Sequence, residues 1–263
     1  MNWFEAMILG LIQGLTEFLP VSSSGHLELG KYLFGMDHEA NFYFSIVVHG
    51  ATVLSTILVL WKEIADLIKG VFKFRLNEET KYVIKILISM IPVGIAGFFL
   101  IDIAEKFFRG NMISLGIEFL ISALLLLMTL FIKPKERPIG FFDSFIIGIA
   151  QAIAILPGIS RSGATIATGM MLGNKKADIA KFSFLMVLIP IIGANLVEMK
   201  SGDFTTEGTS VIVILIGFVT AFISGYFACK WMITLVKKGN LLWFAVYCIL
   251  AGIFSILLGL HVI

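Results

Sequence analysis

Long apolar segments alternate with short polar ones along the whole chain. Six of the apolar segments are long enough to cross a membrane as helices, because a helical crossing needs about 20 residues. They cover residues 42–61, 82–101, 112–132, 179–197, 211–235 and 241–262. The pattern therefore predicts an all-α polytopic membrane protein.

Two further apolar segments, 3–19 and 141–156, lead into breaks. Each is followed by a Ser- and Gly-rich turn and then by a shorter apolar piece, 27–35 in the first case and 164–173 in the second. Pro and Gly interrupt helices, and a broken backbone is tolerated within a bilayer only where protein or a water-filled cavity covers it. We therefore predict two re-entrant helical hairpins, each entering and leaving the membrane on one side.

Composition agrees with a membrane protein. Apolar residues make up 58% of the chain and charged residues only 14%, against about 45–50% and about 25% in soluble proteins. The net charge of +2 gives no sign of nucleic-acid binding. Cys229 and Cys248 lie in apolar segments and predict neither a disulfide nor a metal site. No basic stretch opens the chain, so we expect no cleaved signal peptide.

The distribution of basic residues favours hairpins over two additional crossings. One side then holds Lys62, Lys69, Lys73, Arg75, Lys81, Lys85, Lys133, Lys135, Arg137, Lys175, Lys176, Lys181, Lys230, Lys237 and Lys238. The other side holds only Lys31, Lys106, Arg109 and Lys200, with Arg161 alone at depth. Loops rich in Lys and Arg face the cytoplasm. We therefore expect both termini and the mouth of the first hairpin to face the exterior, and the second hairpin to enter from the cytoplasm.

The chain also repeats itself at an offset of 138 residues. Residues that match at this offset include Phe4 and Phe142, Gly10 and Gly148, Gln13 and Gln151, Ser22 and Ser160, Ser24 and Ser162, and Gly25 and Gly163. Each half holds one hairpin and three transmembrane helices, and an odd number of crossings gives the halves opposite orientations. We predict one membrane domain over 1–263 built as an inverted-topology repeat, with halves at about 1–135 and 139–263. The alternative is chance similarity between two Gly- and Ser-rich breaks.

The first hairpin carries a cluster of reactive side chains. Gln13 and Glu17 are four residues apart and share a helix face, and Ser23 and His26 follow in the turn. Polar groups at membrane depth are costly and indicate a functional site. Glu17 could act as a general base, orient His26, or bind a metal ion together with Gln13. His26 could activate Ser23, protonate a leaving group or be the nucleophile; the alternative is a helix cap or a polar-core hydrogen bond.

The second hairpin carries groups suited to phosphate. Arg161 offers a planar fork of donors that fits phosphate oxygens. Both turns precede short helices, whose free N–H groups attract anions. The predicted phosphate-binding residues are Ser22, Ser160, Arg161, Ser162 and Thr165. The alternative for the hydroxyl residues is hydrogen bonding to carbonyls of their own helices.

Two other polar residues lie inside predicted spans, namely His49 and Glu118. They either line the cavity of the site or make a polar contact between helices.

The segments Gln13–Glu17, Pro20–His26 and Pro157–Thr165 resemble the two signature motifs of the bacitracin-resistance family of undecaprenyl-pyrophosphate phosphatases. The resemblance runs the length of the chain, and the family carries Glu or Gln at the position of Gln13. It implies functional positions at Glu17, Ser23, His26, Ser160, Arg161 and Thr165.

The same resemblance implies hydrolysis of the lipid carrier's pyrophosphate, which recycles the carrier for cell-wall synthesis and confers bacitracin resistance. It also implies a divalent cation, Mg²⁺ or Ca²⁺, and a site on the outer face of the bacterial cytoplasmic membrane. Bacitracin would compete for the substrate, and a homodimer is one expectation for the assembly.

A transporter or flippase of a phosphorylated polyprenyl lipid is the main alternative function, because inverted repeats with broken helices are a transporter architecture. Such a carrier needs Arg161 and the anion-binding turns. It has no use for a nucleophile beside a base, so Glu17, Ser23 and His26 favour the enzyme. A structural scaffold explains none of these residues.

Overall fold

The computed structural model describes residues 1–36, 42–99, 111–132, 135–156, 158–200 and 209–261. Within these ranges the regular structure is helical, apart from an isolated bridge between Arg137 and Asn174. The helices are α1 (Trp3–Phe18), α2 (Ser23–Leu33), α3 (Phe42–Val59), α4 (Trp61–Val71), α5 (Glu78–Phe99), α7 (Met112–Met128), η1 (Thr129–Phe131), α8 (Phe141–Ile153), α9 (Arg161–Met171), α10 (Lys176–Lys200), α11 (Val211–Lys238) and α12 (Leu242–Gly259). The prediction of an all-α membrane protein is confirmed.

Five of the six predicted spans are present as helices that are long and apolar enough to cross a membrane. They are α5, α10, α11, α12 and the run of α7 into η1 over Met112–Phe131. Their bounds differ from the predicted ones by a few residues, because a helix continues into the polar residues that flank an apolar segment.

The predicted span over 42–61 differs from the structure. Helix α3 ends at Val59, and the chain turns by 75° into α4, so a sixth crossing exists only if the bent pair crosses together. Charged residues such as Lys62 and Asp66 alternate with apolar ones such as Ile64 and Leu67 along α4. Such an amphipathic helix is stable at the membrane interface, and this explains why it departs from the direction of α3.

Both predicted breaks are present as pairs of short helices. Helices α1 and α8 have 16 and 13 residues, fewer than a crossing requires. Helices α2 and α9 begin earlier than the predicted pieces at 27 and 164, because the turn serines cap them. The hydroxyl oxygen of Ser22 accepts a hydrogen bond from the backbone N–H of Gly25 at 3.2 Å, and that of Ser160 accepts one from Gly163 at 3.0 Å. Entry and exit on one membrane side stay predictions.

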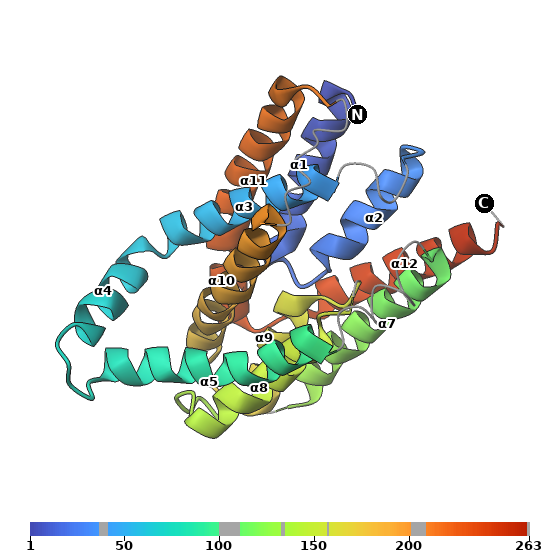
Figure 1. Cartoon of the computed structure of the whole chain (residues 1–263). Coiled ribbons are helices and arrows are strands. Elements are labelled where there is room, and N and C mark those ends of the chain that lie inside the picture. Colours follow the sequence, from blue (N-terminus) through green and yellow to red (C-terminus); the bar gives the residue numbers. More distant parts are fainter. Residues whose placement is uncertain (37–41, 100–110, 133–134, 157, 201–208, 262–263) are drawn as a thin grey trace.

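The helices pack in close pairs. Helix α1 lies along α11, α8 lies along α5, and α7 lies along α12 (Figure 1). Glycines permit this approach: a Cβ at Gly10 would overlap the carbonyl oxygen of Gly217, and one at Gly148 would overlap the carbonyl oxygen of Ser89. Small residues at helix contacts are the usual means of close packing in membranes.

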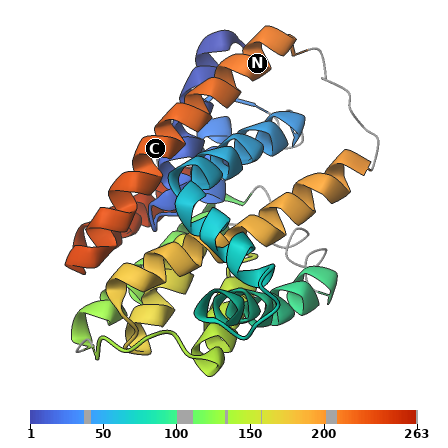
Figure 2. The ribbon, with the colours of Figure 1, turned by 90° about the vertical axis from the view of Figure 1, so that its left-hand side faces the viewer.

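Helices α3 and α10 lie between the α1–α11 pair and the α5–α8 pair (Figure 2). Phe182, Phe184 and Met186 of α10 are fully buried and belong to the largest apolar cluster. Large apolar side chains such as Phe98 and Phe227 are exposed on the outer helices, as a lipid-facing surface requires. The two breaks therefore lie inside protein, where their polar groups find partners.

Candidate active site

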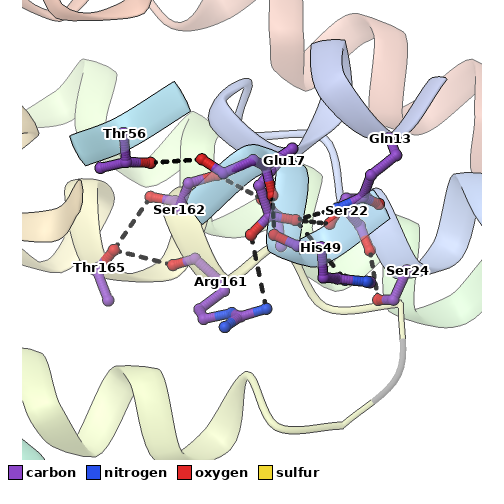
Figure 3. Close-up of polar contacts among 12 residues, drawn as sticks. Gln13, Glu17, Ser22, Ser24, His49, Thr56, Arg161, Ser162 and Thr165 are labelled. Atoms are coloured by element: carbon purple, nitrogen blue, oxygen red, sulfur yellow. Dashed lines mark hydrogen bonds and ion pairs between the residues drawn. The ribbon is translucent and has the colours of Figure 1, made fainter. Parts of the chain in front are cut away.

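The ends of the two hairpins meet beside α3. Glu17 comes from the last turn of α1, Ser23 and His26 from the first turn of α2, and Arg161 from the first residue of α9. Figure 3 shows Glu17 and Arg161 pointing toward one another from the two hairpins, with His49 close to them. The structure thus brings together side chains that are 144 residues apart in the sequence.

The carboxylate of Glu17 is the centre of this cluster, and its side chain is 7% exposed. Its Oε2 accepts hydrogen bonds from Ser23 Oγ at 2.6 Å and from Gln13 Nε2 at 2.9 Å. Nη2 of Arg161 lies 3.7 Å from Oε1, and Nε2 of His49 lies 3.9 Å from Oε2. A buried carboxylate is stable only when paired and hydrogen-bonded, so these partners explain why Glu17 tolerates its position.

The hydrogen bond from Ser23 to Glu17 gives a hydroxyl a direct proton acceptor. A serine becomes a nucleophile when an adjacent base takes its proton, and 2.6 Å is within the reach of a general base. The structure places Glu17, rather than His26, at this distance from Ser23.

His26 is held by two hydrogen bonds of its own. Nδ1 lies 2.7 Å from the backbone oxygen of Ser22, and Nε2 lies 2.7 Å from the hydroxyl of Tyr247. A carbonyl oxygen only accepts, so Nδ1 carries a proton, and Nε2 of the neutral ring accepts from the tyrosine. His26 therefore needs Tyr247 to move before Nε2 can act on a substrate. Tyr247 lies on α12, and no sequence motif pointed to it.

Hydrogen bonds between backbone groups and serine side chains join the two turns. The N–H of Gly158 donates to Ser24 Oγ at 3.3 Å, and Ser162 Oγ donates to the carbonyl of Leu19 at 3.0 Å. Ser22 has a φ of 70°, a conformation that is costly for a residue with a side chain and that clusters at functional sites. Pro157 of the predicted motif lies outside the described residues.

The predicted phosphate-binding hydroxyls are already engaged with the protein. Ser22 and Ser160 cap their helices, and Ser160 N donates to Ser122 Oγ at 2.9 Å. Thr165 Oγ1 lies 2.9 Å from the carbonyl of Arg161 and 2.6 Å from Ser183 Oγ. The hydroxyl of Thr165 thus hydrogen-bonds to a carbonyl of its own helix, which was the alternative to phosphate binding. Its contact with phosphate stays a prediction.

A cavity of about 20 Å³ lies between the hairpins. Its polar lining comes from Glu17, Thr52, Thr56, Gln151, Arg161, Ser162, Thr165 and Ser183. The side chain of Arg161 is 29% exposed, so the cation also faces outward from the cavity. A cavity of this size is large enough for a water molecule and far smaller than an ordinary ligand pocket.

Oxygen atoms in the cluster suit a hard cation. Oε1 of Gln13 is buried without a hydrogen-bond partner and lies on the side chain that contacts Glu17. Carboxylate and amide oxygens are ligands for Mg²⁺ and Ca²⁺, and Mg²⁺ often takes its remaining ligands from substrate phosphates and water. The described residues contain no group of three or more His, Cys, Asp or Glu side chains that could hold a metal. Substrate oxygens would therefore have to complete the coordination of a cation bound by Gln13 and Glu17.

Sequence reasoning missed Thr52 and Thr56, and it left the places of Gln151, His49 and Glu118 open. Thr52 and Thr56 line the cavity, and the repeat named Gln151 only as a counterpart of Gln13. His49 contacts Glu17 but is not among the residues that line the cavity. Glu118 lies against Gly158, where its Oε1 has no partner. Nothing in their local sequence distinguishes the threonines from ordinary residues of a membrane helix.

Known proteins match the chain over nearly its whole length. The family model described as Bacitracin resistance protein BacA matches residues 6–254. A protein of Parabacteroides distasonis named undecaprenyl-diphosphatase is 54% identical over 260 residues, which cover 97% of this chain and 98% of that protein. Proteins of the same name from Bacteroides fragilis and Methanosphaera stadtmanae are 53% and 37% identical, over 98% and 97% of this chain and 99% and 97% of their own length. The chain therefore belongs to the bacitracin resistance protein BacA family.

Proposed function

We propose that this protein hydrolyses undecaprenyl pyrophosphate to undecaprenyl phosphate and inorganic phosphate. The observation that carries the proposal is the 2.6 Å hydrogen bond from Ser23 to Glu17, with Arg161 on the other oxygen of the same carboxylate. A nucleophile, a base and a cation then meet at one point. The names of the relatives, undecaprenyl-diphosphatase, support the same reaction.

The geometry suggests a two-step route. Ser23 Oγ attacks the terminal phosphorus while Glu17 Oε2 takes its proton, and the bond from that phosphorus to the bridging oxygen breaks. Undecaprenyl phosphate leaves and receives the proton from Glu17. A water molecule then attacks the phosphoserine, and the serine oxygen recovers a proton as inorganic phosphate leaves. Phosphoryl transfer depends mainly on positioning and charge stabilisation, which the guanidinium of Arg161 would supply.

His26 and water remain the other candidate nucleophiles. We favour Ser23 because the two ring nitrogens of His26 are bound to Ser22 and Tyr247. Rapid quenching with labelled substrate distinguishes the three. A phosphoserine at position 23 would support our assignment, a phosphohistidine at 26 would overturn it, and the absence of both would indicate direct attack by water.

A divalent cation fits the proposal. Glu17 and Oε1 of Gln13 would hold it together with substrate oxygens, and it would neutralise charge on the pyrophosphate. Removal of divalent cations with a chelator should abolish phosphate release, and Mg²⁺ or Ca²⁺ should restore it. Full activity in chelator would remove the cation from the proposal.

Release of phosphate in detergent tests the function directly. We expect wild-type protein to release phosphate from undecaprenyl pyrophosphate, and Ser23→Ala to lower the turnover number at least about 10⁴-fold, as loss of a nucleophile does in other hydrolases. Ser144→Ala is a matched control, because Ser144 is buried and bonds only to the carbonyl of Gly140. No release by wild type would favour the transporter, since transport has no meaning in detergent.

We also propose that the fold is an inverted-topology repeat with its site between the halves. A shift of 138 residues carries α2, Ser23–Leu33, onto α9, Arg161–Met171. The same shift carries α1 onto α8 and α5 into α11, and α1 packs on α11 as α8 packs on α5. Ser22 and Ser160 make the same cap in the two turns.

The charge asymmetry of the loops supports insertion in a cytoplasmic membrane with the first hairpin open to the exterior. Cysteine labelling at Asn2 by a membrane-impermeant reagent in intact cells tests this orientation. Bacitracin as a competitor for the substrate, and a homodimer, are further parts of the proposal. Inhibition by bacitracin that rising substrate relieves would support the first, and the mass of the protein in detergent would decide the second.

A further inference from the structure

Gln151 on α8 is a buried polar side chain that the proposed reaction does not use. It is 1% exposed, and neither its Nε2 nor its Oε1 has a hydrogen-bond partner. Buried amide groups are nearly always hydrogen-bonded, because an unpaired one loses its interaction with water without compensation. Such an exception at a candidate site indicates that the missing partner is a water molecule or a polar group of a ligand that replaces it.

The position of Gln151 indicates what kind of ligand. Gln151 lines the same cavity as Glu17 and Arg161. The hydroxyls of Thr52 and Thr56 on α3 donate to backbone carbonyls of their own helix. Nε2 of Gln151 thus has two N–H donors without a partner. Both face a cavity that the side chain of Arg161 also lines.

The matching residue of the first hairpin shows why Gln151 is free. Nε2 of Gln13 donates to the carboxylate of Glu17 one turn later. At the equivalent position after Gln151 the chain has Ile155, whose side chain cannot accept a hydrogen bond. The same amide is thus held by a carboxylate in one hairpin and left without a partner in the other.

We propose that Gln151 binds a phosphate group of the substrate through Nε2, next to Arg161. The inference rests on the proposed function and adds a residue to its phosphate site. Phosphate oxygens accept hydrogen bonds and carry the charge that Arg161 attracts. A neutral amide adds a directed donor without a second positive charge, so it selects the position of the phosphate and does not hold the product strongly.

Substitution of Gln151 by Met removes the amide and keeps the length of the side chain. We expect KM for a polyprenyl pyrophosphate to rise about 10- to 100-fold, the factor for loss of a hydrogen bond to a charged group, with kcat within about threefold. Because an unpaired buried amide is unfavourable, the thermal midpoint without substrate should be equal or higher. A structural residue would instead lower the midpoint and leave KM unchanged.

Ser255→Ala is the matched control, because Ser255 Oγ is also buried without a partner but lies outside the cavity. Its KM should equal that of wild type. If Gln151→Met does not fold, Gln151→Glu keeps the shape and places a repelling charge beside phosphate, so its KM must rise at least as far. An unchanged KM in the folded variant, or a fall in kcat alone, would overturn the inference.

Inhibition by inorganic phosphate distinguishes the two sources of the phosphate group. Weaker inhibition of Gln151→Met by the same factor as the rise in KM would place the phosphate that is released at Gln151. Unchanged inhibition together with a raised KM would place the phosphate that stays on the lipid there. If wild type hydrolyses no polyprenyl pyrophosphate, the proposed function fails, and binding of inorganic pyrophosphate to wild type and Gln151→Met still tests the inference.

Discussion

The two hairpins have the same backbone design and opposite chemistry. In both, a serine caps the second helix by accepting a hydrogen bond from the N–H of a glycine three residues later. Ser23 of the first hairpin corresponds to Arg161 of the second, and Glu17 corresponds to Ile155. The first hairpin therefore holds the carboxylate and the proposed nucleophile, and the second holds the cation.

This difference shows how two similar helix pairs can produce a site that neither pair contains alone. The caps and the close glycine contacts are needed for any broken helix in a membrane, so both hairpins have them. The charged residues are needed only once each, and their opposite signs attract across the boundary between the hairpins, where Arg161 lies 3.7 Å from Glu17. The serine caps and glycine contacts are common to both hairpins, whereas the charged residues differ between them.

Removing the charge of the second hairpin should have the largest effect. We expect Arg161→Ala to lower kcat about 10³- to 10⁵-fold, the range for loss of an arginine that stabilises a phosphoryl-transfer transition state. Arg161→Lys should recover only part of this, because a lysine lacks the planar fork. Phosphate release measures both variants, and near-normal turnover of Arg161→Ala would show that the second hairpin does not supply the cation.

Removing the charge of the first hairpin should have the next largest effect. Glu17→Gln keeps the shape but cannot take a proton from Ser23, so we expect kcat to fall about 10²- to 10⁴-fold. Glu17→Asp should fall less because it retains a base. If Glu17→Gln and Glu17→Asp were equally active, the carboxylate would serve only to hold the turn.

Substitution of Gly10 and Gly148 tests whether the two hairpins pack in the same way. A methyl group at Gly148 would overlap the carbonyl of Ser89, as one at Gly10 would overlap that of Gly217, so each substitution by alanine should destabilise the fold by about 1–3 kcal/mol. Gly94→Ala is the control, because a Cβ there meets nothing within 4 Å. Thermal unfolding in detergent compares the stability of the three variants. A loss of stability in only one of Gly10→Ala and Gly148→Ala would contradict a common packing role.

The smallest effect is expected at Tyr247. Its hydroxyl hydrogen-bonds His26, a residue without a counterpart in the second hairpin, where Ala164 takes its place. Tyr247→Phe should lower kcat about 10-fold, the effect of losing one hydrogen bond that orients a side chain. Tyr226→Phe, at a tyrosine outside the site on α11, should change nothing. Activity equal to wild type in both would show that the hydrogen bond between Tyr247 and His26 has no part in turnover.

The sequence predicted the helices well because apolar length alone decides a membrane crossing. Five spans and both breaks follow from that rule. It could not predict the 75° bend between α3 and α4, since no Pro or Gly marks Leu60 and the apolar pattern continues to Trp61. The bend depends on where the polar face of α4 begins, which a count of apolar residues does not detect.

Within the site, local motifs were sufficient for the residues of the two turns. The hydrogen bond from Ser23 to Glu17 joins residues in one short segment. From their positions in the sequence, Glu17 and His26 were the two candidate partners of Ser23. Tyr247, Thr52 and Thr56 come from other helices, and their arrival depends on how those helices rotate. Gln151 was visible only through the repeat, and its unpartnered amide is a property of packing that no single sequence contains.

The pairing of α1 with α11 has a consequence for biosynthesis. The ribosome makes residues 3–18 well before residues 211–238. At about 5–20 residues per second, roughly 10 to 40 s separate the two. During that time the first hairpin has its polar turn but not the helix that covers it. The nascent chain must therefore shelter Glu17 and its neighbours at the translocon, at the lipid interface or with a chaperone until α11 arrives.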